Sequence, residues 1–312
     1  MVSRVDSRVD SRVDRDRAGP PRCHTEQVTH GRAEIHELLL ANDLRPSRAL
    51  GQNFVADGNT VRRIVRLSGV GPGSRVVEIG AGLGSLTLAL VEAGAEVTAV
   101  EIDRHVAPVL RRLVEPLGVT VVEADAQKLD FGELLGPAPG WSLVANLPYN
   151  VAVPLVVRVL EEAPQVSTLL VMVQREVGER LAARARDEAY GAVSVKIAYW
   201  ATAAVVGKVS PSVFIPRPRV ESVLVRMDRH DPVAVAGRDT PGPGSPEYER
   251  LFAVVRGGFA HRRKMLRRSL EHLVEPGAFV AAGIAPTARA EELGLDEWER
   301  LAAWRPEVSA AS

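Results

Sequence analysis

The 312-residue chain lacks the features that mark secreted and membrane proteins. Its single cysteine, Cys23, excludes an internal disulfide, which is typical of a reducing compartment. No stretch approaches the roughly 18 apolar residues of a membrane-spanning helix, and the charged residues after Met1 do not form a secretory signal. These absences predict a cytoplasmic protein without a membrane partner.

The chain also lacks a net charge and a metal-binding pattern. It contains 39 lysines and arginines against 39 aspartates and glutamates, so any surface for nucleic acid must be local. None of the seven histidines pairs with another at metal-ligand spacing, and one cysteine cannot form a zinc cluster. We therefore predict no metal.

Hydrophobic residues make up 46% of the chain, which allows a sizeable core and two domains. Residues 3–14 repeat Ser-Arg-Val-Asp three times, with too few apolar side chains to offset the entropy of ordering. We expect residues 1–32 to be a disordered leader, or the product of a start codon assigned too far upstream. The Pro- and Gly-rich residues 231–246 predict a linker between a larger domain at 33–230 and a helical domain at 247–312.

Strand and helix patterns alternate through the larger domain. Asp57 can cap a helix that runs to Ser68, with Gly69 as its stop. Fully apolar strands and amphipathic helices follow it. The expected strands are 74–80, 96–103, 119–125, 141–146 and 167–174, and the expected helices are 85–94, 104–118 and 153–163. This alternation favours a parallel, doubly wound α/β sheet.

A glycine loop joins the first of these strands to its helix. Gly80, Gly82 and Gly84 occupy alternate positions there, where glycine lets the backbone approach a ligand. The spacing is G-x-G-x-G and not the G-x-G-x-x-G that binds a dinucleotide pyrophosphate. Glycine turns also serve packing, so the loop alone leaves the ligand open.

Acidic residues follow the next two strands. Glu101 can accept both hydroxyls of a ribose, and Asp125 can accept a hydrogen bond from an adenine amino group. Each residue also has an explanation without a ligand: Glu101 can be a solvated carboxylate at a strand end, and Asp125 can be an ordinary turn residue. Together with the glycine loop they describe an adenosyl site without a phosphate receptor. S-adenosylmethionine fits that description and a dinucleotide does not.

The fourth strand ends in Asn146-Leu147-Pro148-Tyr149. The side-chain oxygen of Asn146 and the main-chain carbonyl of Leu147 can accept both hydrogens of an exocyclic adenine amine, which localises the nitrogen lone pair. Pro148 would set the turn, and Tyr149 offers a flat face for the base. The alternative is a turn in which Asn146 caps the next helix.

From about Leu44 to Arg268 the chain resembles the rRNA adenine N6-dimethyltransferases, in particular the branch that acts on the small ribosomal subunit. The matching blocks, in family order, are LGQNFVAD, VEIGAGLGSLT, VEID, EADAQ, NLPYN, QREVGERL, YGAVSV, VFIPRPRVESVLV and FAHRRKMLRRSL. The resemblance implies a Rossmann-like class I methyltransferase sheet, which binds S-adenosylmethionine, and a small all-helical C-terminal domain. It implies two adjacent adenosines near the 3′ end of 16S rRNA as substrate, each methylated twice, and a role in subunit maturation.

The resemblance also implies roles for single residues. Asn53 and Val55 would contact the methionine part of the cofactor, and Asn146 would border both cofactor and base. Val55 replaces the usual Leu, a mild departure because that contact is made by the main chain. Phe214 resembles the aromatic residue that sandwiches the target base against Tyr149.

The segment 261–268 is rich in positive charge. By itself such a run is usually a solvated face, but the resemblance places it in an rRNA-binding domain, where phosphate contact is expected. The residues concerned are Arg262, Arg263, Lys264, Arg267 and Arg268. Arg217 and Arg219, which flank the Phe214 loop, touch phosphate or are ordinary surface residues.

Three other functions remain to be weighed. A resistance-type methylase of 23S rRNA tends to carry Ile where this chain has Leu147. A non-catalytic assembly or transcription factor would not need intact Glu101 and Asp125. A nucleotide-dependent oxidoreductase would need the missing phosphate fingerprint. We expect a monomer whose partner is 16S rRNA within the small subunit or its precursor.

Overall fold

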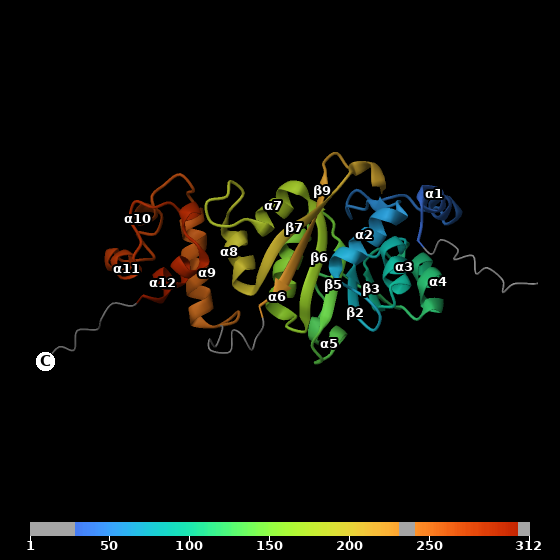
Figure 1. Cartoon of the computed structure of the whole chain (residues 1–312), viewed down its shortest axis with the longest axis horizontal. Helices are drawn as coiled ribbons and strands as arrows, with labels where there is room; N and C mark the ends of the chain where they lie inside the picture. The colour runs from blue at the N-terminus through green and yellow to red at the C-terminus, as the bar shows by residue number, and fades with distance from the viewer. Residues whose placement is uncertain (1–28, 231–240, 305–312) are drawn as a thin grey trace, which may run out of the picture.

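The computed structural model describes residues 29–230 and 241–304. The expected leader up to residue 28, with Cys23, and residues 231–240 of the expected linker lie outside these ranges. Thr29 is buried and the first helix, α1, spans Arg32–Ala41, so the packed chain includes the residues just before Ala33. The molecule is elongated, with a sheet and its helices in one part and the last helices at the other end (Figure 1).

A seven-stranded sheet in the order β4-β3-β2-β5-β6-β9-β7 forms the centre. Its strands are β2 (Arg75–Ile79), β3 (Glu96–Glu101), β4 (Thr120–Glu123), β5 (Trp141–Asn146), β6 (Val166–Gln174), β7 (Ala201–Val209) and β9 (Ser222–Arg229). The five strands expected from the sequence all form and run parallel. The Rossmann-like, doubly wound fold is thereby confirmed.

Beyond the five expected parallel strands, the sheet continues with β9 and β7, which were not among them. Strand β9 runs antiparallel to both β6 and β7, its neighbours. The described residues between β7 and β9 contain a short 3₁₀ turn and no crossover α-helix. A parallel return would need such a crossover, so the chain comes back in the opposite direction.

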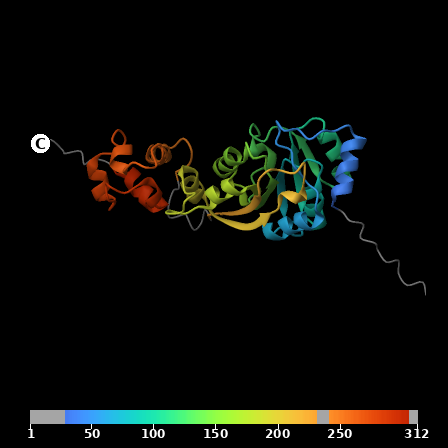
Figure 2. The ribbon, with the colours of Figure 1, turned by 90° about the horizontal axis from the view of Figure 1, so that it is seen from above.

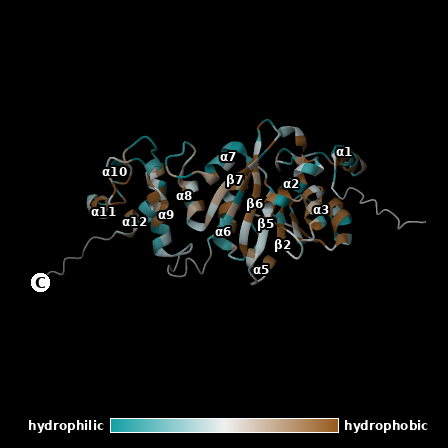
Figure 3. Ribbon diagram, in the orientation of Figure 1, coloured by the Kyte–Doolittle hydropathy of each residue, from teal (hydrophilic) through white to brown (hydrophobic). Residues whose placement is uncertain are grey.

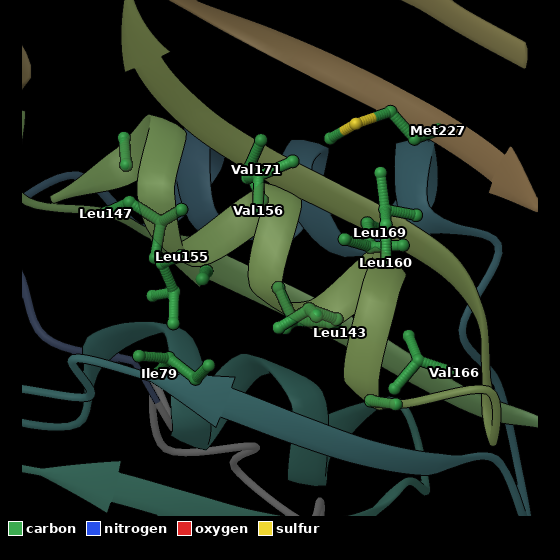
Figure 4. Close-up of a cluster of buried hydrophobic side chains, with 14 of the residues drawn as sticks. Ile79, Leu143, Leu147, Leu155, Val156, Leu160, Val166, Leu169, Val171 and Met227 are labelled. Carbon is green, nitrogen blue, oxygen red and sulfur yellow. The ribbon is translucent and has the colours of Figure 1, made fainter. Parts of the chain in front are cut away.

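Helices cover both faces of the sheet and bury it in two apolar layers. One layer packs under α2 (Gly58–Ser68), α3 (Ser85–Glu92) and α4 (Ala107–Val114). The other packs under α5 (Phe131–Leu135), α6 (Ala152–Glu162), α7 (Arg175–Ala182) and α8 (Ala192–Trp200). In the second layer, Leu155, Val156 and Leu160 of α6 face side chains of the strands (Figure 4).

Local chemistry sets the helix ends. The Asp57 side chain accepts a hydrogen bond from Thr60 N at 2.6 Å, and Gly69 closes α2 in the left-handed conformation, as the sequence predicts. Helix α4 begins at Ala107, later than the expected Arg104. Its Pro108 lacks an N–H and therefore suits only the first turn of a helix.

The C-terminal helices form a second core. They are α9 (Pro246–Phe259), α10 (Leu266–Ser269), α11 (Pro276–Ala281) and α12 (Leu295–Ala303). Figure 3 shows hydrophobic and hydrophilic residues on α9, and Phe252 of this helix and the buried Trp298 of α12 both belong to this core. None of the described helices is long and apolar enough to cross a membrane.

Helix α8 connects the two cores. Its Tyr199 packs in the C-terminal core, while its Ile197 packs under the sheet. Lys196 Nζ lies 2.6 Å from Glu161 Oε1 on α6, and the Tyr248 hydroxyl of α9 donates to the same carboxylate. Viewed from above, the C-terminal helices lie at the end of the molecule next to α8 (Figure 2).

Candidate active site

A cleft opens at the carboxyl ends of β2, β3 and β5, the edge at which doubly wound sheets bind ligands. Its wall combines the glycine loop, Glu101, the turn Asn146–Tyr149 and the segment 50–55. An adjoining hollow contains Asp125 and shares Gly80, Ile102 and Pro148 with the cleft. The structure therefore brings together residues that are distant in the sequence.

The segment 50–55 reaches the cleft through a small second sheet. Strand β1 (Phe54–Val55) pairs antiparallel with β8 (Phe214–Ile215). Asn53 and Val55 line the cleft, as does the ring of Phe54, which the sequence did not single out. A Cβ on Gly82 would lie 3.0 Å from that ring, and Gly82 has a φ of 58°, so only glycine suits this position.

The three glycines do not share one role. Gly80 and Gly82 line the cleft, whereas Gly84 does not. A Cβ on Gly84 would lie 3.0 Å from Leu110 of α4, so this glycine lets two helices approach. Its φ of 83° also makes the turn into α3.

Glu101 is buried in the cleft wall and only 4% exposed. Its Oε2 accepts from Gly82 N at 2.7 Å, and its Oε1 accepts from Asp103 N at 2.9 Å. Burial raises the pKa of Glu101, and these amide hydrogen bonds oppose the rise. Each carboxylate oxygen keeps a lone pair, so the carboxylate can still accept ribose hydroxyls.

Gln52 links the segment around Ser47 to Asp103, two residues after Glu101. Its Nε2 donates to Asp103 Oδ2 at 2.8 Å, and its Oε1 accepts from Ser47 N at 2.7 Å. Gln52 lies within the block LGQNFVAD, and its sequence context did not indicate a role for it. Its partner lies about 50 residues away, and no local pattern reveals such a contact.

Asp125 lies beyond the end of β4, which closes at Glu123, and not at the strand end itself. Its Oδ1 accepts from Gln127 N at 2.9 Å. Arg158 on α6 holds this loop by donating to the carbonyls of Ala126, at 3.0 Å, and Leu129. The role of Arg158 in holding this loop was, like that of Gln52, not predicted from the sequence.

The turn after β5 presents two acceptors. Asn146 Nδ2 donates to the main-chain oxygen of Asn53 at 2.9 Å, and the amide oxygen, which has no partner in the described part of the chain, remains available as an acceptor. The Leu147 carbonyl accepts no hydrogen bond among the described residues, whereas its side chain is buried. Helix α6 is preceded by Val151 and has no side-chain cap, so Asn146 is not its cap.

Tyr149 is half-buried beside these acceptors. Its hydroxyl lies 3.0 Å from Ser222 Oγ at the start of β9, and Ser222 is fully buried. This contact fixes the ring at the edge of the cleft. Ser222 lay inside the quoted block VFIPRPRVESVLV, but its partner was not evident from the sequence.

Phe214 does not join Tyr149 in the cleft. Its side chain is 1% exposed and packs in the core under α2, and it lines neither the cleft nor the adjoining hollow. The described geometry therefore does not show the expected sandwich of a base between Phe214 and Tyr149. The reason is the pairing of Phe214 with Val55, which turns its side chain into the core.

The basic segment spans the turn between α9 and α10 and the start of α10, far along the molecule from β2 and β3 (Figure 1). All five of its Lys and Arg side chains are exposed. Arg262 donates to the carbonyl of Glu188 at 3.0 Å and lies 3.4 Å from Glu291 Oε2. The other four, Arg263, Lys264, Arg267 and Arg268, have no side-chain partner among the described residues.

The cleft fits S-adenosylmethionine. It offers a buried acid with free lone pairs, a backbone without side chains at Gly80 and Gly82, and an unpartnered buried hydroxyl on Ser85. No group of three potential metal ligands occurs in the part of the chain that the structure describes. Fold and site together define a Rossmann-like methyltransferase that takes its methyl group from S-adenosylmethionine.

A family model confirms the resemblance seen in the motifs. The model for ribosomal RNA adenine dimethylase matches residues 44–305, and the chain belongs to this family. Its activity is therefore S-adenosylmethionine-dependent adenine dimethylation of rRNA. The oxidoreductase alternative is excluded.

Curated relatives and solved structures agree with this assignment. The chain is 46% identical to "Ribosomal RNA small subunit methyltransferase A" of Leifsonia xyli subsp. xyli, over 88% of this chain and 97% of the relative. It is 44% identical to the protein of that name from Streptomyces griseus, over 90% and 96%. The 23S rRNA methyltransferase ErmE is 26% identical, with a TM-score of 0.61 over 80% of this chain and 98% of that one. A dimethyladenosine transferase of Plasmodium falciparum, 20% identical, shares the fold with a TM-score of 0.62 over 78% and 94%.

Proposed function

We propose that this protein dimethylates the N6 atoms of two adjacent adenosines near the 3′ end of 16S rRNA, in the small ribosomal subunit or its precursor. The observation that carries the chemistry is the anchored amide of Asn146, whose oxygen is left free beside the Leu147 carbonyl. Relatives named for the small subunit are 41–46% identical, against 26% for the 23S enzyme, which supports the choice of subunit. We further propose that the protein acts as a cytoplasmic monomer and aids subunit maturation.

The chain's own residues prepare the amine for attack. S-adenosylmethionine, when bound, supplies a methyl group on a positively charged sulfur. Asn146 Oδ1 and the Leu147 carbonyl accept the two N6 hydrogens, which keeps the nitrogen lone pair out of the ring and aims it at that methyl. As positive charge develops on N6, the same two oxygens stabilise it. The product ammonium is acidic and loses its proton to water, so no strong base is required.

Tyr149 supports the target base. A base within a helical stack exposes no face, so each adenosine must be unstacked before it enters the cleft. The Tyr149 ring, held by Ser222, is the face on which it then rests. A stacking role for Phe214 would require its side chain to leave the core, and we do not assign it one.

The two parts of the chain divide the work. We propose residues 33–230 as the cofactor-binding catalytic domain, residues 231–246 as the linker and residues 247–312 as the rRNA-binding domain. Within the last, the exposed cations of the segment 261–268 contact phosphates and position the RNA without reading its sequence.

Purified ribosomal subunits test the substrate. Wild-type protein with radiolabelled S-adenosylmethionine should label small subunits that lack the modification, with up to four methyl groups on two adjacent adenosines. Large subunits should stay unlabelled. Label confined to large-subunit RNA would assign the protein to the 23S enzymes instead. Binding of small subunits without any label would favour a non-catalytic assembly factor.

A further inference from the structure

The last strand of the large sheet has an open edge along one half. Strand β7 ends the sheet, and among the described strands it pairs with β9 alone (Figure 1). Alternate residues of such an edge strand direct their N–H and C=O groups away from the sheet, where another strand can bind them. Apart from the pairing with β9, no backbone hydrogen bond from the described residues reaches residues 202–206.

The other half of the same edge is protected. The register between β7 and β9 shifts between Val205 and Gly207, as at a β-bulge. Beyond the shift, Arg63 Nη1 donates to the Lys208 carbonyl at 2.8 Å, and Lys208 is exposed. Bulges and lysines on an edge strand are common means of preventing a further strand from adding. The unprotected half is therefore the part of β7 that another strand can reach.

A groove follows this open half. It is lined by Ala203, Ala204 and Val205 of β7, by the end of α7 and by the loop 183–189. Consecutive side chains of a strand point to opposite faces of the sheet, so a groove that touches all three runs along the edge itself. Five of its lining residues are alanines, which leave room for the side chains of a partner: Ala182, Ala183, Ala189, Ala203 and Ala204.

The groove carries an excess of negative charge. Three of its charged lining residues are acidic, Glu179, Asp187 and Glu188, and one is basic, Arg184. All four are exposed. Glu179 Oε1 lies 3.8 Å from Arg175 Nε, a long ion pair, and Asp187 Oδ2 accepts from Arg184 N at 2.7 Å. A positively charged occupant is therefore favoured.

The loop of the groove is tied to the C-terminal helices. Arg262 Nη2 donates to the Glu188 carbonyl at 3.0 Å, and Arg186 N donates to the Glu291 carbonyl at 2.8 Å. A ribosomal particle held by the segment 261–268 would therefore lie beside the groove. Its phosphates would be repelled by the three acids. A protein that binds rRNA, by contrast, carries Lys and Arg for the same electrostatic reason as that segment.

We propose that the open half of β7 binds an extended, basic protein segment of the ribosomal particle as an added strand. Main-chain hydrogen bonds to residues 202–205 would hold the segment, and Glu179 and Glu188 would face its Lys and Arg side chains. A second copy of this chain fits less well, because pairing two β7 strands would bring two acidic grooves together. This inference rests on the proposed function.

Reversing the charge of the groove tests the sign of the partner's charge. Glu179→Lys combined with Glu188→Lys should weaken binding of purified small subunits by about tenfold, because two attractions become repulsions. The kcat at saturating subunits should stay unchanged. Asp187 is left in place because it shapes the loop. If rRNA occupies the groove, the same two lysines should tighten binding. Tighter or unchanged binding would overturn the proposal.

A matched variant controls for net charge. Glu96→Lys combined with Glu133→Lys reverses two exposed acids, at the start of β3 and on α5, and should leave the affinity unchanged. Equal weakening by both double variants would reduce the effect to net charge and also overturn the proposal.

Photocrosslinking identifies the occupant. Val205→Cys, in full-length protein with Cys23→Ser, is labelled with a benzophenone, bound to purified small subunits and irradiated. It should crosslink to a Lys- and Arg-rich protein segment. Leu117→Cys, a similarly exposed position after α4, is the control and should give no such product. Crosslinks from position 205 only to rRNA or to a second copy of this chain, or none at all, would contradict the proposal.

Methylation by the wild type separates this inference from the proposed function. If the wild type methylates small subunits but the labelled Val205→Cys protein gives no protein crosslink, only the docking surface is wrong. If the wild type neither binds nor methylates small subunits, the proposed function fails and this inference fails with it.

Discussion

The cleft and the basic segment 261–268, the two parts that we assign to catalysis and RNA binding, are built in opposite ways. In the cleft the side chains of Glu101, Asn146 and Tyr149 are buried or half-buried, and each is held by a fixed partner: Glu101 by two backbone amides, Asn146 by the Asn53 carbonyl and Tyr149 by Ser222. In the basic segment the five Lys and Arg side chains are exposed, and of these only that of Arg262 has a partner among the described residues.

The difference follows from what each part must do. Methyl transfer needs atoms placed within fractions of an ångström, so its residues stand at strand ends and are restrained by distant parts of the chain. Attraction to a phosphate backbone needs positive charge and little geometry. The contrast predicts that cleft variants change the rate or the cofactor affinity steeply, whereas basic-segment variants change RNA affinity gradually and in a salt-dependent way.

The largest effect should come from substituting Asn146 in the cleft. Asn146→Ala removes one of the two acceptors for N6 and should lower kcat by about 10²- to 10³-fold, as for other groups that stabilise developing charge. Small-subunit binding should stay within about twofold, because the basic segment is untouched. Asn59→Ala, an exposed change on α2, is the matched control and should leave kcat unchanged. A variant at Asn146 that keeps most of its kcat would refute the proposed mechanism.

Ionisation of the buried Glu78 carboxyl should destabilise the folded protein, and this loss of unfolding free energy can be measured. Because the folded-state pKa of Glu78 is raised to about 8 from a reference of 4.5, the contribution of this carboxyl group to stability is fully present below the reference pKa and is lost as pH rises through that interval. Between pH 6 and pH 8 the cofactor-free wild type should lose about 2 kcal/mol more unfolding free energy than Glu78→Gln.

Chemical denaturation at several pH values gives this comparison directly. The Gln side chain keeps an acceptor for Thr87 but does not titrate, so it isolates the contribution of the carboxyl group. Parallel pH profiles for the two proteins would show that Glu78 does not titrate in this range.

The basic segment should respond to charge and not to geometry. Arg267→Gln combined with Arg268→Gln should lower the slope of log affinity against log salt by about two, one for each phosphate contact, with kcat at saturating subunits unchanged. Filter binding of small subunits at several salt concentrations measures the slope. Arg66→Gln, an exposed change on α2, serves as the control and should leave the slope unchanged. An unchanged slope in the double variant would remove this segment from the RNA interface.

The smallest effect should come from removing the hydrogen bond between the Tyr149 hydroxyl and Ser222. Ser222→Ala and Tyr149→Phe each remove the same hydrogen bond, and each should lower kcat by about threefold without changing the affinity for S-adenosylmethionine. The double variant should be no worse than either single one, because only one interaction is lost. Effects that multiply would mean that the two hydroxyls act separately.

Much of the fold could be predicted because its signals are local. Apolar runs located the five parallel strands, and Asp57 and Gly69 marked both ends of α2. The direction of β9 could not be read in this way, since it depends on whether the chain crosses over the sheet before pairing.

The candidate site was predictable in part for the same reason. Residues that follow parallel strands must meet at one edge, which brings Gly80, Glu101 and Asn146 together. Phe214 was misplaced because its pairing with Val55, distant in the sequence, decides that its ring faces the core. Gln52 and Ser222 had no assigned role because their partners are equally distant.

By itself, then, the sequence determined the five parallel strands, the cleft edge and the types of group gathered there, because periodicity and turn chemistry act over a few residues. Only the tertiary structure decided which atoms of those groups are free. The amide nitrogen of Asn146 donates to the Asn53 carbonyl and its oxygen does not take part in that bond, while Ser85 Oγ has no partner within the ranges that the structure describes. Hydrogen-bond partners of this kind are chosen by contacts between segments that meet only after the chain has folded.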